Sequence, residues 1–534
     1  MKFSCLFRMV SVPLALALLW HCSSRVETPV ESLILVTLDT QRADFVGAYG
    51  SQKAHTPNID AFAQNGVLWE NAYSLIPITA PAHASLFTSA PPHVLELYNN
   101  GQAFRPPKKF KTLAEIFSEK GLETAAFVSL GVVNSSFDLD RGFQVYEDAF
   151  PPDRWYLHAE EVNTRVFPWI AKHKDDPFFL WIHYSDPHDP YAPPYLLPDC
   201  RVELNGYVWS EVCLQKYELL SWRFPLKKGQ NRIVFRSLKP FPGGQKDFRL
   251  SLNAIAWEHP EGVTLSFEGI HFVHRGNLKS ALIRDEGVIT AESPADGVEL
   301  TITARGNLNL LPSEKILGYA QEVEYMDRQI GFLAEKLREF GLLAKSAIVL
   351  VGDHGEGLGE DLTRVGDQYF GHIHYLYQEY MRVPLILVTP SLEKRGLKLH
   401  QTVTILDVAP TLLGLFGWKK PGFYRGRDLM RSSGMSEPVF EETYSPEAVY
   451  DRFGILDPPW HMVYTPETGR FELYNLKNDP GEDRDLITLE AEEAPLKKIR
   501  KKLQRKADKI LMHKKDVRIL EKERKMLKAL GYIR

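Results

Sequence analysis

The chain has 534 residues, of which 44% are hydrophobic and 25% are charged, and its formal net charge at pH 7 is −4. This length allows a large hydrophobic core and more than one domain. The composition is that of an ordinary globular protein and carries no sign of nucleic-acid binding, so we expect no nucleic-acid partner.

The N-terminus has the pattern of an export signal. Lys2 and Arg8 precede an apolar run over residues 9–20, which is too short to span a bilayer comfortably. Cys22 stands where a bacterial lipoprotein would be cleaved and acylated, although the residues before it are larger than such a signal prefers. Two hypotheses stay open: a lipoprotein tethered to the membrane through Cys22, and a plain signal peptide or uncleaved anchor. We therefore assign residues 1–22 to a signal and expect a periplasmic or envelope-anchored protein.

Two further cysteines, Cys200 and Cys213, lie in the body of the chain. In an exported protein this pair favours one disulfide, and two free buried thiols are the alternative.

Short apolar runs alternate with helical patterns along most of the chain. In chain order, the pattern predicts a strand over 31–39, helices over 56–65, from 79 and over 113–120, strands over 124–129 and 178–183, a helix over 319–340, and strands over 346–351 and 384–388. This alternation is typical of a doubly wound α/β sheet, which binds ligands at the C-terminal ends of its strands. The two parts of this α/β domain are expected over residues 30–198 and 312–435.

Residues 199–311 interrupt the alternation. Their alternating apolar runs, such as 232–236 and 298–303, are separated by turn signals such as Asn205-Gly206. This spacing predicts an inserted all-β sandwich or jelly roll. Carbohydrate binding or substrate positioning is one role for it, and a purely structural insertion is the other.

Residues 436–534 are expected to form a small C-terminal subdomain. The sequence predicts a strand over residues 470–474 in this subdomain. From Leu496 onward the chain becomes strongly basic. Apolar residues recur there at helical spacing, which predicts a terminal helix packed on the body. A surface helix attracted to anionic lipid is the alternative.

The stretch Thr79-Ala-Pro-Ala-His83 offers a hydroxyl at the expected start of a helix. Pro81 suits the first helical turn, and the N–H groups of a helix N-terminus attract anions such as phosphate or sulfate esters. A lone threonine there is more often a simple N-cap.

Candidate metal ligands also fall at the predicted strand ends. Asp39 follows the first strand, and Asp353 and His354 follow a later one. Two carboxylates and an imidazole suit one hard divalent cation, such as Mn²⁺, Mg²⁺ or Ca²⁺. Such a cation would lower the pKa of the Thr79 hydroxyl. Further histidine candidates are His83, His183, His188 and His372.

Several motifs together resemble the sulfatase-like branch of the alkaline phosphatase superfamily. The matching segments are Leu35-Val-Thr-Leu-Asp-Thr-Gln-Arg-Ala-Asp44, Thr56-Pro-Asn-Ile-Asp60, residues 79–88 in register with Cys-x-Pro-x-Arg, residues 183–188, Gly352-Asp-His-Gly-Glu356 and Arg382-Val-Pro384. The resemblance covers the chain apart from the leader and the β insertion. It implies the fold of the alkaline phosphatase/sulfatase type.

The resemblance also implies roles for individual residues. Asp39, Asp353 and His354 would bind the metal, and Thr79 would be the nucleophile. His188 and His372 would act on the anionic group or the leaving oxygen. His83, which occupies the place of the sulfatase arginine, and His183 are the candidates for substrate binding.

Three departures from the sulfatase pattern bear on function. Sulfatases need a cysteine or serine at position 79 for conversion to formylglycine, and Thr79 is not expected to give that aldehyde. The second acid of the sulfatase Asp-Asp pair is Thr40 here, and no Lys-x-x-His pair is evident around residues 128–133. These features resemble the phosphoglycerol and phosphoethanolamine transferases and the phosphodiesterases of the superfamily.

Three hypotheses follow for the function. The first is a metal-dependent phosphoesterase or phosphotransferase that uses Thr79 and acts on an anionic ester linked to a glycan or lipid. The second is a sulfatase of envelope or environmental glycans, which would have to act without formylglycine. The third is a catalytically silent surface-binding protein.

Overall fold

The computed structural model describes residues 30–107, 109–152, 154–193, 199–214, 219–238, 250–275, 278–308, 312–360, 364, 369–432, 436–444, 450–487 and 494–514. The predicted signal peptide and Cys22 lie outside these ranges. Among the helices within them, none combines the length and the apolar character needed to cross a bilayer.

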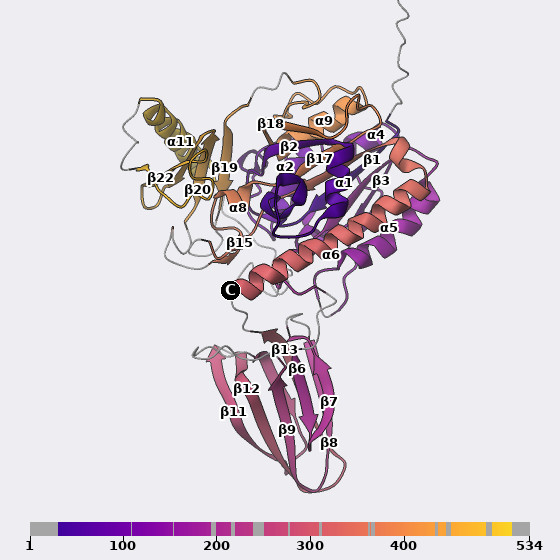
Figure 1. Ribbon diagram of the computed structural model, residues 1–534, viewed down its shortest axis with the longest axis vertical. Coiled ribbons are helices and arrows are strands. Elements are labelled where there is room, and N and C mark those ends of the chain that lie inside the picture. Colours follow the sequence, from indigo (N-terminus) through magenta and orange to yellow (C-terminus); the bar gives the residue numbers. More distant parts are fainter. Residues whose placement is uncertain are drawn as a thin grey trace, which may run out of the picture.

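A mixed eight-stranded sheet forms the centre of the protein (Figure 1). Its strands lie in the order β18-β2-β17-β14-β1-β5-β3-β4, and β1 is parallel to both of its neighbours, β14 and β5. β17 runs antiparallel to its neighbours. The strands are β1 (Ser32–Leu38), β2 (Val67–Tyr73), β3 (Glu123–Phe127), β4 (Val145–Glu147), β5 (Phe178–Tyr184), β14 (Ser346–Gly352), β17 (Leu385–Val388) and β18 (Leu397–Thr404).

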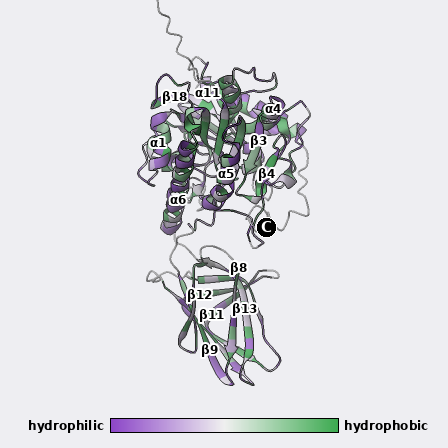
Figure 2. Ribbon diagram, turned by 90° about the vertical axis from the view of Figure 1, so that its right-hand side faces the viewer, coloured by the Kyte–Doolittle hydropathy of each residue, from purple (hydrophilic) through white to green (hydrophobic). Residues whose placement is uncertain are grey.

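Helices cover both faces of this sheet. β1 is apolar on both sides: Leu33 and Leu35 face one hydrophobic core, and Ile34 and Val36 face the other. The face that takes Ile34 packs against α1, α5 and α6, and the opposite face packs against α2, α4 and α9. Figure 2 shows hydrophobic residues along the central strands and hydrophilic residues on the outward side of α6. The arrangement confirms the predicted doubly wound α/β fold.

The helix boundaries agree with the predicted helices except that α6 begins earlier, at Pro312. The α-helices are α1 (Pro57–Asn65), α2 (Thr79–Thr88), α3 (Pro92–Leu95), α4 (Leu113–Glu119), α5 (Ala159–His173), α6 (Pro312–Glu339), α8 (Gln378–Met381), α9 (Val408–Leu415) and α11 (Ala494–His513). The short 3-10 helices are η1 (Ala43–Phe45), η2 (Gly47–Tyr49), η3 (Gly131–Val133), η4 (Ser135–Phe137), η6 (Leu342–Ala344) and η7 (Ile405–Asp407).

The strands from Cys200 to Leu308 form a separate β module, which lies apart from the α/β body in Figure 1. Its strands belong to one sheet and enclose their own hydrophobic core. The two edge strands of this sheet, β7 and β8, lie close together. Trp222 Nε1 of β8 donates a hydrogen bond to Ser210 Oγ of β7 at 3.0 Å. The strands are β6 (Cys200–Leu204), β7 (Tyr207–Val212), β8 (Leu219–Leu226), β9 (Gly229–Ser237), β10 (Leu250–Glu258), β11 (Thr264–Arg275), β12 (Leu278–Ser293) and β13 (Val298–Leu308).

The predicted disulfide is wrong, because Cys200 and Cys213 are both free thiols. Cys200 lies directly opposite Val212 in the β6–β7 pairing, with its side chain buried in the module's core. Cys213 follows Val212, the last residue of β7. Its Sγ contacts Asp199 Oδ2 instead, at 3.7 Å.

A four-stranded antiparallel sheet and α11 form the C-terminal part (Figure 1). The strands of this sheet are β19 (Val439–Thr443), β20 (Arg452–Asp457), β21 (Trp460–Thr465) and β22 (Arg470–Asn475). A separate two-stranded ribbon, made of β15 (Gly357–Leu358) and β16 (Phe370–Gly371), belongs to the α/β body. Leu496, Leu503, Ala507 and Ile510 of α11 are buried in the core that includes this sheet. The terminal helix therefore packs on the body, as its spacing predicts.

Candidate active site

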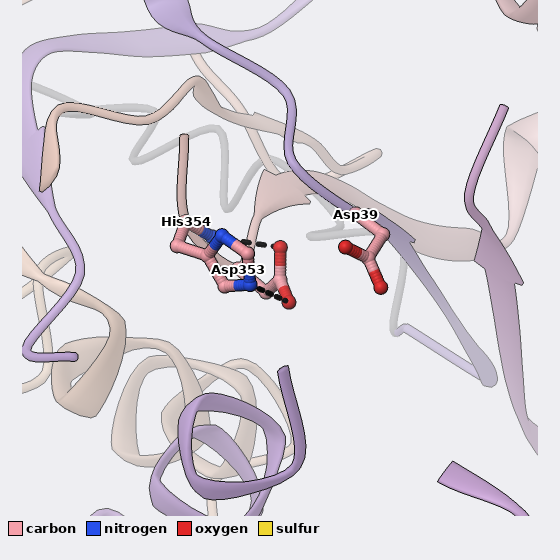
Figure 3. A group of neighbouring side chains, drawn as sticks. All are labelled: Asp39, Asp353 and His354. Carbon is pink, nitrogen blue, oxygen red and sulfur yellow. Dashed lines mark hydrogen bonds and ion pairs between the residues drawn. The ribbon is translucent and has the colours of Figure 1, made fainter. Parts of the chain in front are cut away.

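Asp39, Asp353 and His354 meet at the C-terminal edge of the central sheet (Figure 3). Asp39 follows β1, and Asp353 follows β14, whose last residue Gly352 pairs with Leu38. Because the two strands are parallel neighbours, both carboxylates emerge side by side. The potential ligand atoms of the three residues all lie within 4.8 Å of one another. The structure thus brings together the three predicted metal ligands.

Hydrogen bonds orient these side chains and leave specific atoms for a cation. Asp353 Oδ1 accepts from the backbone N–H groups of Thr40 (3.1 Å) and His354 (2.7 Å), and His354 Nδ1–H donates to the carbonyl of Gly355 at 2.9 Å. His354 Nε2 is therefore the ring nitrogen that faces the site. Asp39 Oδ1 and Asp353 Oδ2 are buried with no hydrogen-bond partner. Two such oxygens are unfavourable without compensation, and a hard divalent cation fits them together with the imidazole.

The pKa shifts of Asp39, Asp353 and His354 also favour a bound cation. Burial, followed by the nearby charge of Asp39, raises the pKa of Asp353 well above its usual range. Burial alone would also raise the pKa of Asp39, but the hydrogen bond from His183 holds it below its usual value. Burial lowers the pKa of His354 to about 3, so that its ring stays neutral and able to bind a metal.

Thr79 is the first residue of α2, and every residue of this helix is buried. Its Oγ1 lies 3.3 Å from His354 Nε2, which places the hydroxyl beside the candidate metal ligands. The N-terminal end of the helix, which is the positive end of its dipole, lies at this point. The hydroxyl, the carboxylates and the imidazole therefore converge as the sequence predicts.

Asn100 is a further polar residue at the start of α2 that we did not predict. Its Oδ1 accepts from the N–H of Ala80 at 2.9 Å, and its Nδ2 is buried with no hydrogen-bond partner. An amide donor that is buried beside a nucleophile is suited to bind an anionic oxygen. In the sequence Asn99-Asn100-Gly101 reads only as a turn, so no local pattern marks this role.

The rings of His372 and His188 form a row that begins at His354. The ring centroids of His354 and His372 are 4.6 Å apart, and those of His372 and His188 are 5.2 Å apart. His372 Nδ1 lies 3.3 Å from a carboxylate oxygen of the buried Glu356. Burial, and then the proximity of His188, lowers the pKa of His372 to about 3. The three rings form one row, the imidazole wall, whose His354 end lies beside Thr79.

His83 and His183 have both ring nitrogens engaged by protein groups. His83 Nδ1–H donates to the Thr79 carbonyl (2.8 Å) and its Nε2 accepts from Thr37 Oγ1 (3.0 Å). His183 Nε2–H donates to Asp39 Oδ2 (3.1 Å), and its Nδ1 contacts Ser129 Oγ (2.9 Å). Neither ring has a nitrogen left for a substrate oxygen. We therefore propose that these residues support Thr79 and Asp39, in place of the substrate contacts predicted for them.

Comparison with known proteins identifies the family. A sequence profile with the description Sulfatase matches residues 31–418. The chain belongs to the sulfatase family. A second profile, N-sulphoglucosamine sulphohydrolase, C-terminal, matches residues 366–509. The match to the Sulfatase profile confirms the resemblance inferred from the motifs.

Individual relatives of this sulfatase-family protein are distant but span its length. It is 22% identical to the uncharacterized sulfatase YidJ of Escherichia coli, over 85% of this chain and 83% of that protein. The structure of a 2-O GAG sulfatase superposes with a TM-score of 0.57 at 18% identity, over 93% of this chain and 96% of that one. The phosphonate monoester hydrolase of Agrobacterium radiobacter gives a TM-score of 0.56 at 15% identity, over 92% and 98%. The fold therefore occurs in proteins named for sulfur-ester and for phosphorus-ester chemistry.

Proposed function

We propose that this sulfatase-family protein is a metal-dependent hydrolase or transferase of phosphate esters that uses Thr79 as its nucleophile. The observation that carries the proposal is the position of the Thr79 hydroxyl, at the N-terminus of α2 and 3.3 Å from His354 Nε2. A threonine does not supply the formylglycine of ordinary sulfatases, so the hydroxyl itself is the available nucleophile. No formylglycine cofactor is expected.

A divalent cation held by Asp39, Asp353 and His354 would supply positive charge that lowers the pKa of a nearby hydroxyl and offsets charge on the ester. Thr79 Oγ forms a bond to phosphorus as the bond from phosphorus to the leaving oxygen breaks. The Thr79 proton passes to solvent water, and the leaving oxygen takes up one proton on the side where His188 and His372 lie, so that the two transfers balance. Asn100 Nδ2 binds a non-bridging oxygen of the ester at the positive end of α2.

The resulting phosphothreonine is then cleaved by water, which restores the Thr79 hydroxyl, or by an alcohol, which makes the protein a transferase. Phosphorus suits this two-step route, because attack on phosphothreonine is ordinary phosphoryl transfer. A sulfated threonine is harder to clear, whereas the formylglycine hydrate of sulfatases clears by collapsing to the aldehyde.

Sulfate-ester hydrolysis is the second candidate function, and family membership favours it. This function would require the protein to hydrolyse sulfate esters with the Thr79 hydroxyl in place of formylglycine. The organic part of the substrate is proposed to be a glycan or lipid of the cell envelope, and the 2-O GAG sulfatase among the structural neighbours supports a glycan. Export, with a membrane tether through Cys22, fits such a substrate and belongs to the same proposal.

The test is a comparison of matched aryl esters. The mature protein is given nitrophenyl phosphate monoester, nitrophenyl phosphate diester and nitrophenyl sulfate, with Mn²⁺ and with chelator, alongside Thr79→Val. Val matches the shape of Thr without its hydroxyl, so the comparison isolates the nucleophile. We expect metal-dependent turnover of a phosphate ester that Thr79→Val lacks. Sulfate turnover with no phosphate turnover would refute the phosphoesterase and favour the second candidate.

A further inference from the structure

An acidic cavity lies next to the imidazole wall and is not used by the proposed chemistry. His188 lines it, together with Ser185, Asp186, Asp189, His158 and Glu322. The ring of His188 is also the neighbour of His372, so the cavity adjoins the active site. Its volume is about 20 Å³, which is room for one water-sized group.

Two of the carboxyl groups that line the cavity are buried. Asp186 is 5% exposed and Glu322 is 3% exposed, and no lysine or arginine is among the described residues that line the cavity. Burial and the proximity of Asp186 raise the pKa of Glu322 well above its usual range. Buried carboxylates of this kind are normally paired with a cation or a hydrogen-bond donor.

One atom in the cavity is left without any partner. Asp186 Oδ1 accepts from the N–H of Ala159, the first residue of α5, at 3.1 Å and lies 3.6 Å from His158 Nδ1. Asp186 Oδ2 is buried and has no hydrogen-bond partner. A donor that enters the cavity would satisfy this oxygen, and a cationic donor would also form an ion pair with the Asp186 carboxylate.

We infer that this cavity binds a primary ammonium group carried by the organic part of the ester substrate. The inference rests on the proposed function and names a substrate class for it: a zwitterionic ester, with the anionic group at Thr79 and an amine beyond His188. An ammonium group is about the size of a water molecule and fits the cavity, whereas a trimethylammonium group is too large for it. A neutral hydroxyl would donate a hydrogen bond to Asp186 Oδ2 but would not form an ion pair with this carboxylate.

Matched substrates test the inference. The full-length protein is assayed with a series of nitrophenyl ω-aminoalkyl phosphates of increasing chain length and with the matching ω-hydroxyalkyl phosphates, so that each pair differs only in the ammonium group. The series includes chains long enough to extend from Thr79 to the cavity. For these chains we expect the ratio of kcat/KM values to favour the amine by about tenfold or more in the wild type. Asp186→Asn keeps an oxygen that can accept from the N–H of Ala159, and Glu322→Gln keeps the shape of the Glu322 side chain. Each of these variants should bring the ratio of kcat/KM values close to one. Glu335→Gln, an exposed change on α6, is the control and should keep the wild-type ratio.

A binding measurement separates this inference from the proposed function. The thermal unfolding of the Thr79→Val protein, which needs no turnover, is followed with methylammonium, tetramethylammonium or potassium chloride at equal ionic strength. We expect methylammonium alone to raise the Tm, and Asp186→Asn to abolish the rise. Equal effects of the three cations, or a wild-type ratio near one at every chain length in the kinetic assay, would overturn the ammonium site. If the wild type cleaves none of these esters, the proposed function fails, and the Tm comparison still decides the ammonium site.

Discussion

Single atoms at the ends of β1 and β14 decide what the site can do. Asp39 Oδ1, Asp353 Oδ2 and Asn100 Nδ2 have no hydrogen-bond partner, although Asp353 Oδ2 lies 3.4 Å from His354 Nε2. The first two are acceptors and the third is a donor, so the site offers a place for a cation and a place for an anionic oxygen within one buried region. This pairing is what a metal-assisted attack on a phosphate ester requires.

Asn100→Asp tests the donor. The variant keeps Oδ1 as the acceptor for Ala80 N–H but replaces the buried NH₂ with an oxygen that repels an anionic ester. We expect kcat to fall by about 10²-fold, as for other donors that stabilise developing charge, with little change in the Tm. Asn99→Asp, at the neighbouring position, is the matched control. A kcat within a factor of about 2 of the wild type would show that Asn100 does not contact the ester.

Asp353→Asn tests the metal site. In the wild type, a cation present at 100 times its Kd should raise the free energy of unfolding by about 2.7 kcal/mol. The variant loses one ligand charge, so we expect neither this metal-dependent gain nor activity. Without metal it should be at least as stable as the wild type, because it removes the repulsion between two buried carboxylates. Equal stabilisation of both proteins by Mn²⁺, measured by thermal unfolding, would place the metal elsewhere.

At the scale of elements, the C-terminal sheet is tied to the segment that carries His372. His461 of β21 bonds Glu441 of β19 through Nε2 (2.9 Å) and Glu482 through Nδ1. Glu482 Oε2 in turn accepts from the N–H of Gln378, the first residue of α8, at 2.7 Å. These three side chains are fully buried, so the connection between the two parts depends on a charged, shielded cluster.

This cluster predicts a pH dependence of stability. Burial alone would lower the pKa of His461, but Glu482 and Glu441 raise it from the ordinary 6.5 to about 10. A raised histidine pKa stabilises the folded state fully below pH 6.5, and the gain is lost as the pH rises towards 10. We expect the free energy of unfolding to fall across this window by a few kcal/mol, on the order of 1.4 kcal/mol per pKa unit.

His461→Gln is the comparison for that window, because glutamine can hydrogen-bond but does not titrate. Chemical denaturation at several pH values should show a shallower decline for the variant than for the wild type. Parallel curves for the two proteins between pH 6.5 and 10 would contradict a charged His461 in the folded state.

Most of the α/β elements could be predicted from the sequence because their patterns are local. The apolar run of β1 and the Pro-Asn-Ile-Asp start of α1 are typical signals, and the observed bounds agree with them. α5 was not predicted, and Pro168 inside it interrupts the helical pattern. The free thiols and the role of Asn100 depend on strand register and on contacts between distant segments, which a single sequence does not display.

The same limit applies within the candidate site. Asp39, Thr79, Asp353 and His354 could be placed together because each stands at the end or start of a predictable element. For His83 and His183 the residue type was informative but the orientation was not. Only the fold shows that Thr37 and Ser129 occupy their second nitrogens.

At the scale of the whole molecule, the inserted β module has its own hydrophobic core and lies apart from the α/β body (Figure 1). Both of its ends connect to the body, after β5 and before α6. The candidate metal ligands and Thr79 come from other elements, so the module is not needed to assemble them.

Replacement of residues 200–308 by a short Gly/Ser linker should leave aryl ester turnover and the Tm of the remaining protein unchanged. Turnover of a large glycan substrate should change if the module positions it. Activity on the aryl ester and unfolding by circular dichroism are the measurements. Loss of the folded state on excision would show that the module is part of the body's core.

The central claim is that Thr79 itself attacks phosphorus, and its direct test is detection of the covalent intermediate. The protein is mixed with an aryl phosphate ester that contains radiolabelled phosphorus, quenched in acid and digested, and the labelled peptide is sequenced. We expect the label on Thr79 in the wild type and no labelled peptide in Thr79→Val. Phosphate-ester turnover by the wild type with no label on Thr79, or with the label on another residue, would contradict the account.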